Sequence, residues 1–160
     1  MRHKSFKNLL IFSLFGIAMW FFGNLYEGIV LMPNTLFGSV QKLQAWQNLF
    51  VESNPAYFYL IANLAVVATW ILFFRTPKES TDIKRLLKYA SLILLAAIVL
   101  SVYIITQINL KFFFGDLSKY DTVQIHSAAV LWNVLNSIRV VLVGAALVFM
   151  FRANVETQKA

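Results

Sequence analysis

Four long apolar segments alternate with shorter polar ones along the 160-residue chain. A helix needs about 20 predominantly apolar residues to cross the hydrocarbon core of a bilayer. The second segment is bounded by turn and helix-end signals, Asn54-Pro55 before it and Arg75-Thr76-Pro77 after it. The pattern predicts an all-α integral membrane four-helix bundle that forms one domain over residues 1–160, with spans at about 9–32, 56–74, 86–107 and 125–151.

The connection between the first two spans has a helical pattern of its own. Apolar residues recur there at steps of three and four, with Gln and Asn between them: Leu36, Val40, Leu43, Trp46 and Phe50. This pattern predicts a short amphipathic interfacial helix over the mouth of the bundle, and an irregular loop is the alternative.

Lysine and arginine are divided unevenly between the two sides of the predicted membrane. Ten of them precede the first span, surround the connection between the second and third spans, or lie in the C-terminal tail. The other side has three, Lys42, Lys111 and Lys119. Cytoplasmic loops carry the excess of these residues. We therefore expect both termini in the cytoplasm and the protein in a membrane of the bacterial inner (plasma) type.

Composition supports this interpretation and excludes several classes of protein. The chain is 59% hydrophobic and 13% charged, which is too apolar and too weakly charged for an ordinary water-soluble domain. The net charge of +7 comes from residues that flank the spans, so the expected partner is the lipid bilayer and not nucleic acid. The absence of cysteine excludes disulfides and thiolate metal sites.

Polar and aromatic side chains inside the spans are the candidate functional residues, because polar groups in hydrocarbon are costly. In each span they fall on one helical face, which predicts a polar, aromatic-lined pocket in the outer half of the bundle. The first span contributes Trp20, Asn24 and Glu27, the second Tyr59, Asn63 and Trp70, the third Tyr103 and Gln107, and the fourth His126, Trp132, Asn133, Asn136 and Arg139.

Glu27 and Arg139 are the ionisable groups deepest in this face. Side chains lean toward the N-terminus of their helix, so Glu27 on an outgoing helix and Arg139 on an incoming helix lean toward each other. We expect a buried ion pair, direct or through Asn24 and Asn136. Such a pair has two interpretations, a functional site or a clamp that fixes the register of the helices.

The candidate residues give no support for a cofactor or a metal. Haem inside a membrane usually needs a well-buried histidine, and His126 lies near the predicted surface. A zinc or iron site needs two or three close histidine and carboxylate ligands, and only His126 and Glu27 are available. We expect neither group.

Two patches resemble the anthrone oxygenase-like family of small four-helix membrane proteins. They are Gly23-Asn24-Leu25-Tyr26-Glu27 with Met32-Pro33, and Trp132-Asn133 with Asn136 and Arg139. The resemblance implies oxygen insertion into an anthrone without an evident metal or flavin. Glu27 would then be the general base, and Arg139, Asn133 and Asn136 would stabilise the enolate oxygen. The rings of Trp20, Trp70 and Trp132 would enclose the substrate.

Two other functions remain open. One is a non-catalytic binding or carrier protein for a lipid or another apolar small molecule, which would use the same pocket. The other is a structural accessory subunit, in which the polar residues only hold the helices together. The sequence also leaves open assembly as a homo-oligomer.

Overall fold

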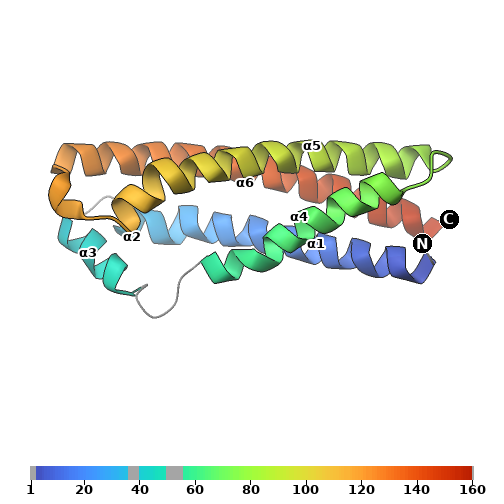
Figure 1. Ribbon diagram of the computed structural model, residues 1–160, viewed down its shortest axis with the longest axis horizontal. Helices are drawn as coiled ribbons and strands as arrows, with labels where there is room; N and C mark the ends of the chain where they lie inside the picture. Colours follow the sequence, from blue (N-terminus) through green and yellow to red (C-terminus); the bar gives the residue numbers. More distant parts are fainter. Residues whose placement is uncertain (1–2, 36–39, 50–55, 160) are drawn as a thin grey trace.

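The computed structural model describes residues 3–35, 40–49 and 56–159, and every element in these ranges is helical. Four long helices form the bundle, and shorter helices close one end of it (Figure 1). In chain order the elements are α1 (His3–Tyr26), η1 (Glu27–Leu31), α2 (Met32–Thr35), α3 (Val40–Leu49), α4 (Ala56–Arg75), α5 (Thr81–Ile104), η2 (Ile105–Phe113), η3 (Leu117–Lys119) and α6 (Thr122–Lys159).

The four predicted spans are confirmed. Within the described ranges, four helical segments are long and apolar enough to cross a membrane: Lys4–Leu31, Tyr57–Arg75, Thr81–Phe112 and Thr122–Lys159. The third and fourth helices are longer than the sequence predicted. The third continues past Gln107 because the apolar pattern persists to Phe112, and the fourth continues through its polar tail, where Lys159 pairs with Glu156 one turn earlier.

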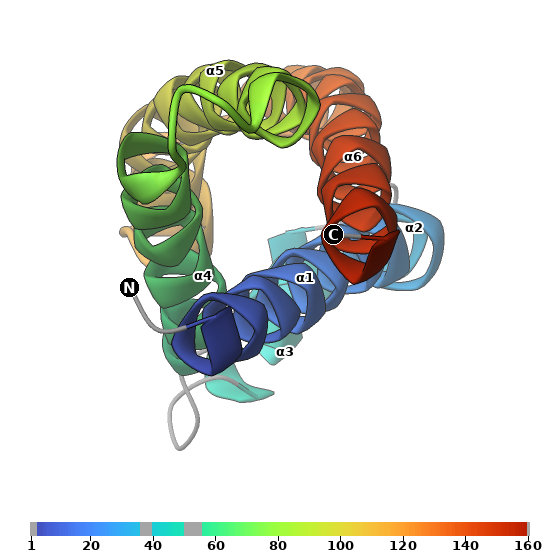
Figure 2. The ribbon, with the colours of Figure 1, turned by 90° about the vertical axis from the view of Figure 1, so that its right-hand side faces the viewer.

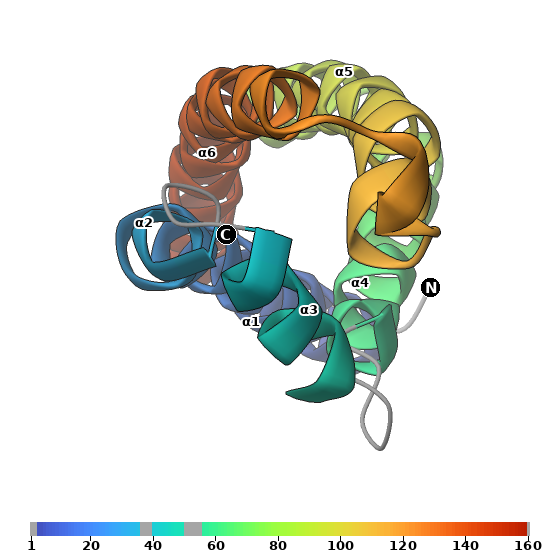
Figure 3. The same ribbon diagram turned by 90° about the vertical axis from the view of Figure 1, so that its left-hand side faces the viewer.

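Viewed along its axis, the bundle is a ring in the order α1, α4, α5, α6, in which each helix packs against its two neighbours (Figures 2 and 3). Both termini lie at the same end, as an even number of spans requires (Figure 1). We call this the terminal end, and we call the opposite end, which carries α2, α3 and η3, the loop end.

The terminal half of the bundle has an apolar core. Leucine, isoleucine and methionine fill it, and small residues such as Ala65, Ala90 and Ala146 lie between the helices. Gly16 lets α1 approach α4 closely, because a Cβ at this position would collide with the Cβ of Ala65. Small residues at such contacts are the usual means of close helix packing in membranes.

Helix α3 confirms the predicted amphipathic helix between the first two spans. It lies across the loop end (Figure 3), where Leu43 is fully buried in a second apolar cluster with Met32 and Ile108. The Gln47 side chain donates hydrogen bonds to the carbonyl oxygens of Phe112 and Gly115, which fixes α3 to the end of η2. Leu36 and Phe50, two residues of the predicted pattern, are outside the described ranges.

Candidate functional site

Glu27 and Arg139 form the predicted ion pair across the interface of α1 and α6. The distance from Arg139 Nη2 to Glu27 Oε2 is 3.4 Å, and the two side chains are 8% and 20% exposed, Arg139 being the more buried. The two helices run in opposite directions, and their side chains converge as the lean toward each N-terminus predicts. The pair joins the first and last spans, and Glu27 lies about one turn from the loop end of the first span.

Tyr59 brings a third helix to the pair. Its phenol donates a hydrogen bond of 2.5 Å to Glu27 Oε1, so each carboxylate oxygen has a donor of its own. Gly23 leaves the space for this contact, since a Cβ there would lie 3.3 Å from the Tyr59 oxygen and 2.7 Å from the Phe58 ring. The sequence placed Tyr59 on the polar face but did not identify its partner.

Asn136 supports Arg139 from one turn earlier on α6. Its Oδ1 accepts from Arg139 Nη2 at 2.6 Å and from Nε at 3.2 Å. Its Nδ2 donates to the backbone oxygen of Asn24 at 3.0 Å. Gly28 permits this approach, because a Cβ there would lie only 3.0 Å from Asn136 Nδ2. Asn136 therefore links Arg139 to the α1 backbone at Asn24, but the predicted indirect link does not reach Glu27, because the Asn24 side chain makes no hydrogen bond among the described residues.

Trp132 extends the network toward η2. The Arg139 guanidinium carbon lies 5.9 Å from the centre of the Trp132 ring, within the range of a cation–π interaction. The Trp132 indole N–H donates to Asn109 Oδ1 at 2.9 Å. All four long helical segments therefore contribute to one network, as predicted, but the third contributes Asn109, which the sequence analysis missed because it ended this span at Gln107.

Irregular backbone coincides with the network. Glu27 is the first residue of the π-helical turn η1, in which the N–H of Met32 bonds to the Glu27 carbonyl five residues earlier. Asn109 lies within the longer π-helical segment η2. Such turns within α-helices are frequently found at functional sites.

Two polar groups near the pair have no partner among the described residues. The side chain of Asn24 is fully buried, and neither its Nδ2 nor its Oδ1 makes a hydrogen bond. The recorded bonds of Arg139 use Nε and Nη2 and leave Nη1 available. We call Asn24, Glu27, Tyr59, Asn136 and Arg139 the charged cluster.

The remaining predicted site residues lie outside the charged cluster. Trp20 is buried in the apolar core, closer to the terminal end than Asn24. Trp70 lies 11 residues from Tyr59, about 16 Å along α4, and donates to the Ser91 carbonyl oxygen. Asn133 is half-buried, whereas Asn63, Tyr103, Gln107 and His126 are exposed. Depth along the helix separates the two tryptophans from the cluster, whereas the four exposed residues do not lie on the interior face that helical periodicity predicted for them.

Within the part of the chain that the structure describes, no three His, Asp or Glu side chains form a group that could hold a metal ion. The cluster contains one carboxylate, one guanidinium, one phenol and two amides. These groups can bind an oxygen-bearing ligand, transfer a proton or hold helices together.

Comparison with protein-family models, with curated proteins and with solved structures finds no match to this chain.

Proposed function

We propose that the charged cluster binds an apolar, ring-bearing small molecule through a polar oxygen and that the protein acts on it as a cofactor-free oxygenase of anthrone-like compounds. The observation that carries the proposal is the Asn24 side chain, which is fully buried with both polar atoms unpartnered. A buried amide without hydrogen bonds costs about 1–3 kcal/mol. A ligand oxygen that accepts from Asn24 Nδ2 offsets this cost.

The free donors suit an oxygen that becomes negatively charged. Arg139 Nη1 and Asn24 Nδ2 are available to a ligand, whereas Asn136 already uses its amide on Arg139 and on the Asn24 backbone. Stabilisation of an enolate oxygen is therefore assigned to Arg139 and Asn24. Asn136 becomes a positioning residue that fixes the direction of the guanidinium.

Glu27 supplies the base in this proposal. Deprotonation of the anthrone methylene by the carboxylate gives an aromatic enolate, and dioxygen, the second substrate, takes up electrons from that carbanion. Carbon–oxygen bond formation, followed by loss of water, converts the CH₂ group and O₂ into a C=O group and H₂O. The bilayer is the solvent from which so apolar a substrate would come, and the surrounding helices would limit the access of water.

The binding part is tested with Asn24→Leu beside Asn136→Leu. Because the Asn24 side chain makes no hydrogen bond in the chain, we expect Asn24→Leu to keep or raise the melting temperature of the ligand-free protein. Asn136→Leu, which removes three hydrogen bonds, should lower it. Native mass spectrometry of protein from its own membrane should show a small-molecule adduct in the wild type that Asn24→Leu lacks. An adduct that persists in Asn24→Leu contradicts the proposed site.

The catalytic part is tested with anthrone as the probe. Oxygen uptake and anthraquinone formation are measured above the protein-free background, for the wild type and for Glu27→Gln. We expect Glu27→Gln to bind anthrone and to lose at least 100-fold in rate, the lower end of what general base catalysis contributes, about 10²–10⁴-fold. Equal rates in the two proteins refute the role of Glu27. Binding without turnover in the wild type supports a carrier, and neither binding nor turnover supports a structural subunit.

A further inference from the structure

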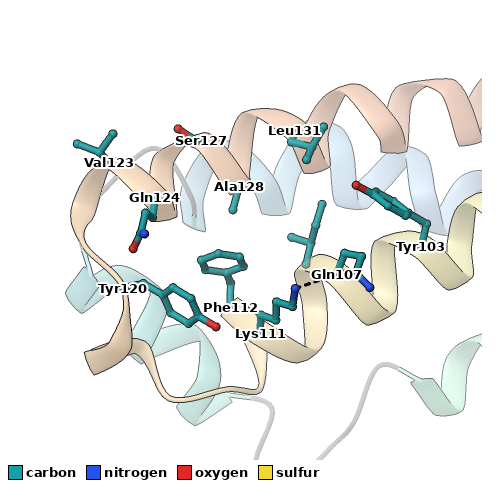
Figure 4. Close-up of a pocket in the computed structure, with 11 residues that line it drawn as sticks. Tyr103, Gln107, Lys111, Phe112, Tyr120, Val123, Gln124, Ser127, Ala128 and Leu131 are labelled. Atoms are coloured by element: carbon teal, nitrogen blue, oxygen red, sulfur yellow. Dashed lines mark hydrogen bonds between the residues drawn. The ribbon is translucent and has the colours of Figure 1, made fainter.

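A hollow lies on the surface of the bundle at the loop end, away from the charged cluster. It is a groove of about 580 Å³ between η2 and the first three turns of α6 (Figure 4). Exposed side chains border it, including Tyr103 at 48% and Val123 at 73%. In a membrane this groove faces lipid, because it opens outward between two spanning helices.

The groove is polar at one end and apolar at the other. Lys111, Tyr120 and Gln124 lie near the ends of the two spans, where the bilayer changes from hydrocarbon to headgroups. Ala128 and Leu131 continue the groove along α6 toward the middle of the bundle. Helix α6 borders the groove from Val123 to Leu131, a length of about 12 Å.

Lys111 is the single charged residue in the lining, which contains no acidic side chain. Its ammonium donates to Gln107 Oε1 at 2.9 Å, which holds it over the groove and leaves two N–H donors (Figure 4). The hydroxyls of Tyr103, Tyr120 and Ser127 have no recorded hydrogen bond within the described ranges. The Tyr120 ring is fixed by packing against Phe112 at 4.5 Å. Lys111 and Tyr120 lie toward the same end of the groove, whereas Tyr103 lies beside Leu131 at the other end (Figure 4).

We infer that this groove binds one phospholipid with a net negative headgroup, from the leaflet at the loop end. The phosphodiester would accept from Lys111 and from the Tyr120 hydroxyl, and one acyl chain would follow Ile108, Ala128 and Leu131. A zwitterionic headgroup fits less well, because its ammonium would face a lysine and no carboxylate. Of the neighbouring charges, Lys119 pairs with Asp116, and the Asp121 carboxylate accepts from the backbone N–H of Gln124 at the start of α6.

Native mass spectrometry of the protein released from nanodiscs tests the inference. The nanodiscs contain equal amounts of phosphatidylglycerol and phosphatidylcholine. We expect one retained phosphatidylglycerol with an enrichment of about fivefold over the bulk ratio, which is what one lysine contributes near an anionic surface. Lys111→Gln should reduce the enrichment to about one. Lys119→Gln, a matched exposed lysine at the same end but outside the groove, should leave it unchanged.

A steric pair of variants tests the groove without altering its charge. Ser127→Phe places a ring in the groove and should release the lipid, whereas Ser137→Phe, on an exposed position of α6 outside the groove, should not. Inorganic phosphate is the probe for a free-anion site, and we expect no binding of it in detergent. The inference is overturned if the wild type shows no enrichment, if both lysine variants lose it equally, or if Ser127→Phe retains the lipid.

Discussion

Replacing Arg139 by methionine is the most direct test of the energetics of the charged cluster. Methionine keeps much of the apolar stem and removes the guanidinium. The change leaves Glu27 without its counter-charge and Asn136 Oδ1 without either of its donors, while Tyr59 still donates to the carboxylate. It also removes the contact with the Trp132 ring.

The expected magnitude follows from these losses. Removing one partner of a buried ion pair costs about 3–5 kcal/mol. The 20% exposure of Glu27 favours the lower end for this part of the loss, because solvent can partly stabilise the remaining charge. The unsatisfied Asn136 oxygen adds about 1–3 kcal/mol. We therefore expect Arg139→Met to lower the free energy of unfolding by about 4 kcal/mol.

A double-mutant cycle separates the pair from its surroundings. Glu27→Gln keeps an acceptor for Tyr59 but leaves the more buried Arg139 without its counter-charge, so we expect it to cost about 3 kcal/mol alone. In Glu27→Gln/Arg139→Met no buried charge is left unpaired, and the double variant should be about 2 kcal/mol more stable than the sum of the two single changes predicts. Unfolding is followed by tryptophan fluorescence in mixed micelles with increasing SDS.

Arg152→Met is the matched control, since it makes the same change on the same helix at an exposed position. We expect it to shift stability by less than about 0.5 kcal/mol. The reasoning is refuted if Arg139→Met costs no more than Arg152→Met, or if the effects of the two cluster variants simply add.

Three further predictions concern the packing and the loop end. Gly16→Ala should push α1 away from Ala65 and cost about 1–3 kcal/mol, measured by the same micelle unfolding. Gln47→Leu should speed hydrogen exchange over η2 and η3 without changing exchange in the terminal half of the bundle, because Gln47 tethers α3 to the end of η2. Hydrogen bonds from the Ser118 side chain and then from its backbone N–H lower the pKa of Asp116. A lowered folded pKa means that the carboxylate stabilises the turn above the unfolded pKa and that this contribution is lost as the pH falls through the folded value. The protection factor of the Ser118 amide should fall with acid in that range, and the fall should be absent in Asp116→Asn.

Much of the architecture could be predicted because the physics of the bilayer is simple. Spans need length and apolarity, and ionisable groups within them need partners, so the helices and the Glu27–Arg139 pair follow from the sequence. The link through Asn136 also follows, since it lies one turn from Arg139 on the same face. These predictions depend on local periodicity and on the antiparallel direction of α1 and α6.

Other features depend on how helices approach one another, which periodicity does not encode. Trp70 shares a polar face with Tyr59 but lies nearer the terminal end, where α4 packs against α5. Its indole N–H therefore donates to the Ser91 carbonyl oxygen and not to the charged cluster. The Tyr59–Glu27 bond requires the close approach that Gly23 permits. A glycine indicates that two helices can come close but does not identify the side chain that will occupy the space.

The π-helical segments explain the largest difference between prediction and structure. The expectation that Gln107 lines the interior assumed one α-helix with an unbroken register, whereas Tyr103 lies in the regular helix α5 and is exposed there. In η2 the turn is wider, so residues beyond Ile104 no longer repeat at α-helical angles. Asn109 consequently reaches Trp132 in the interior, whereas Gln107 and Lys111 border the outward groove.

The same irregular backbone divides the bundle into two parts with different roles. The terminal half is regular and has an apolar core, which supplies packing. The loop half carries both π-helical segments, one beginning at Glu27 and the other containing Asn109 and Lys111. A π turn interrupts the regular α-helical hydrogen-bond pattern. Within hydrocarbon it is therefore stable only where surrounding contacts compensate for the altered backbone hydrogen bonds. In this protein those contacts are the ion pair, the Trp132–Asn109 bond and the attachment of α3. Polar groups are thus concentrated where the helices are least regular, and both proposed ligand sites lie in that half.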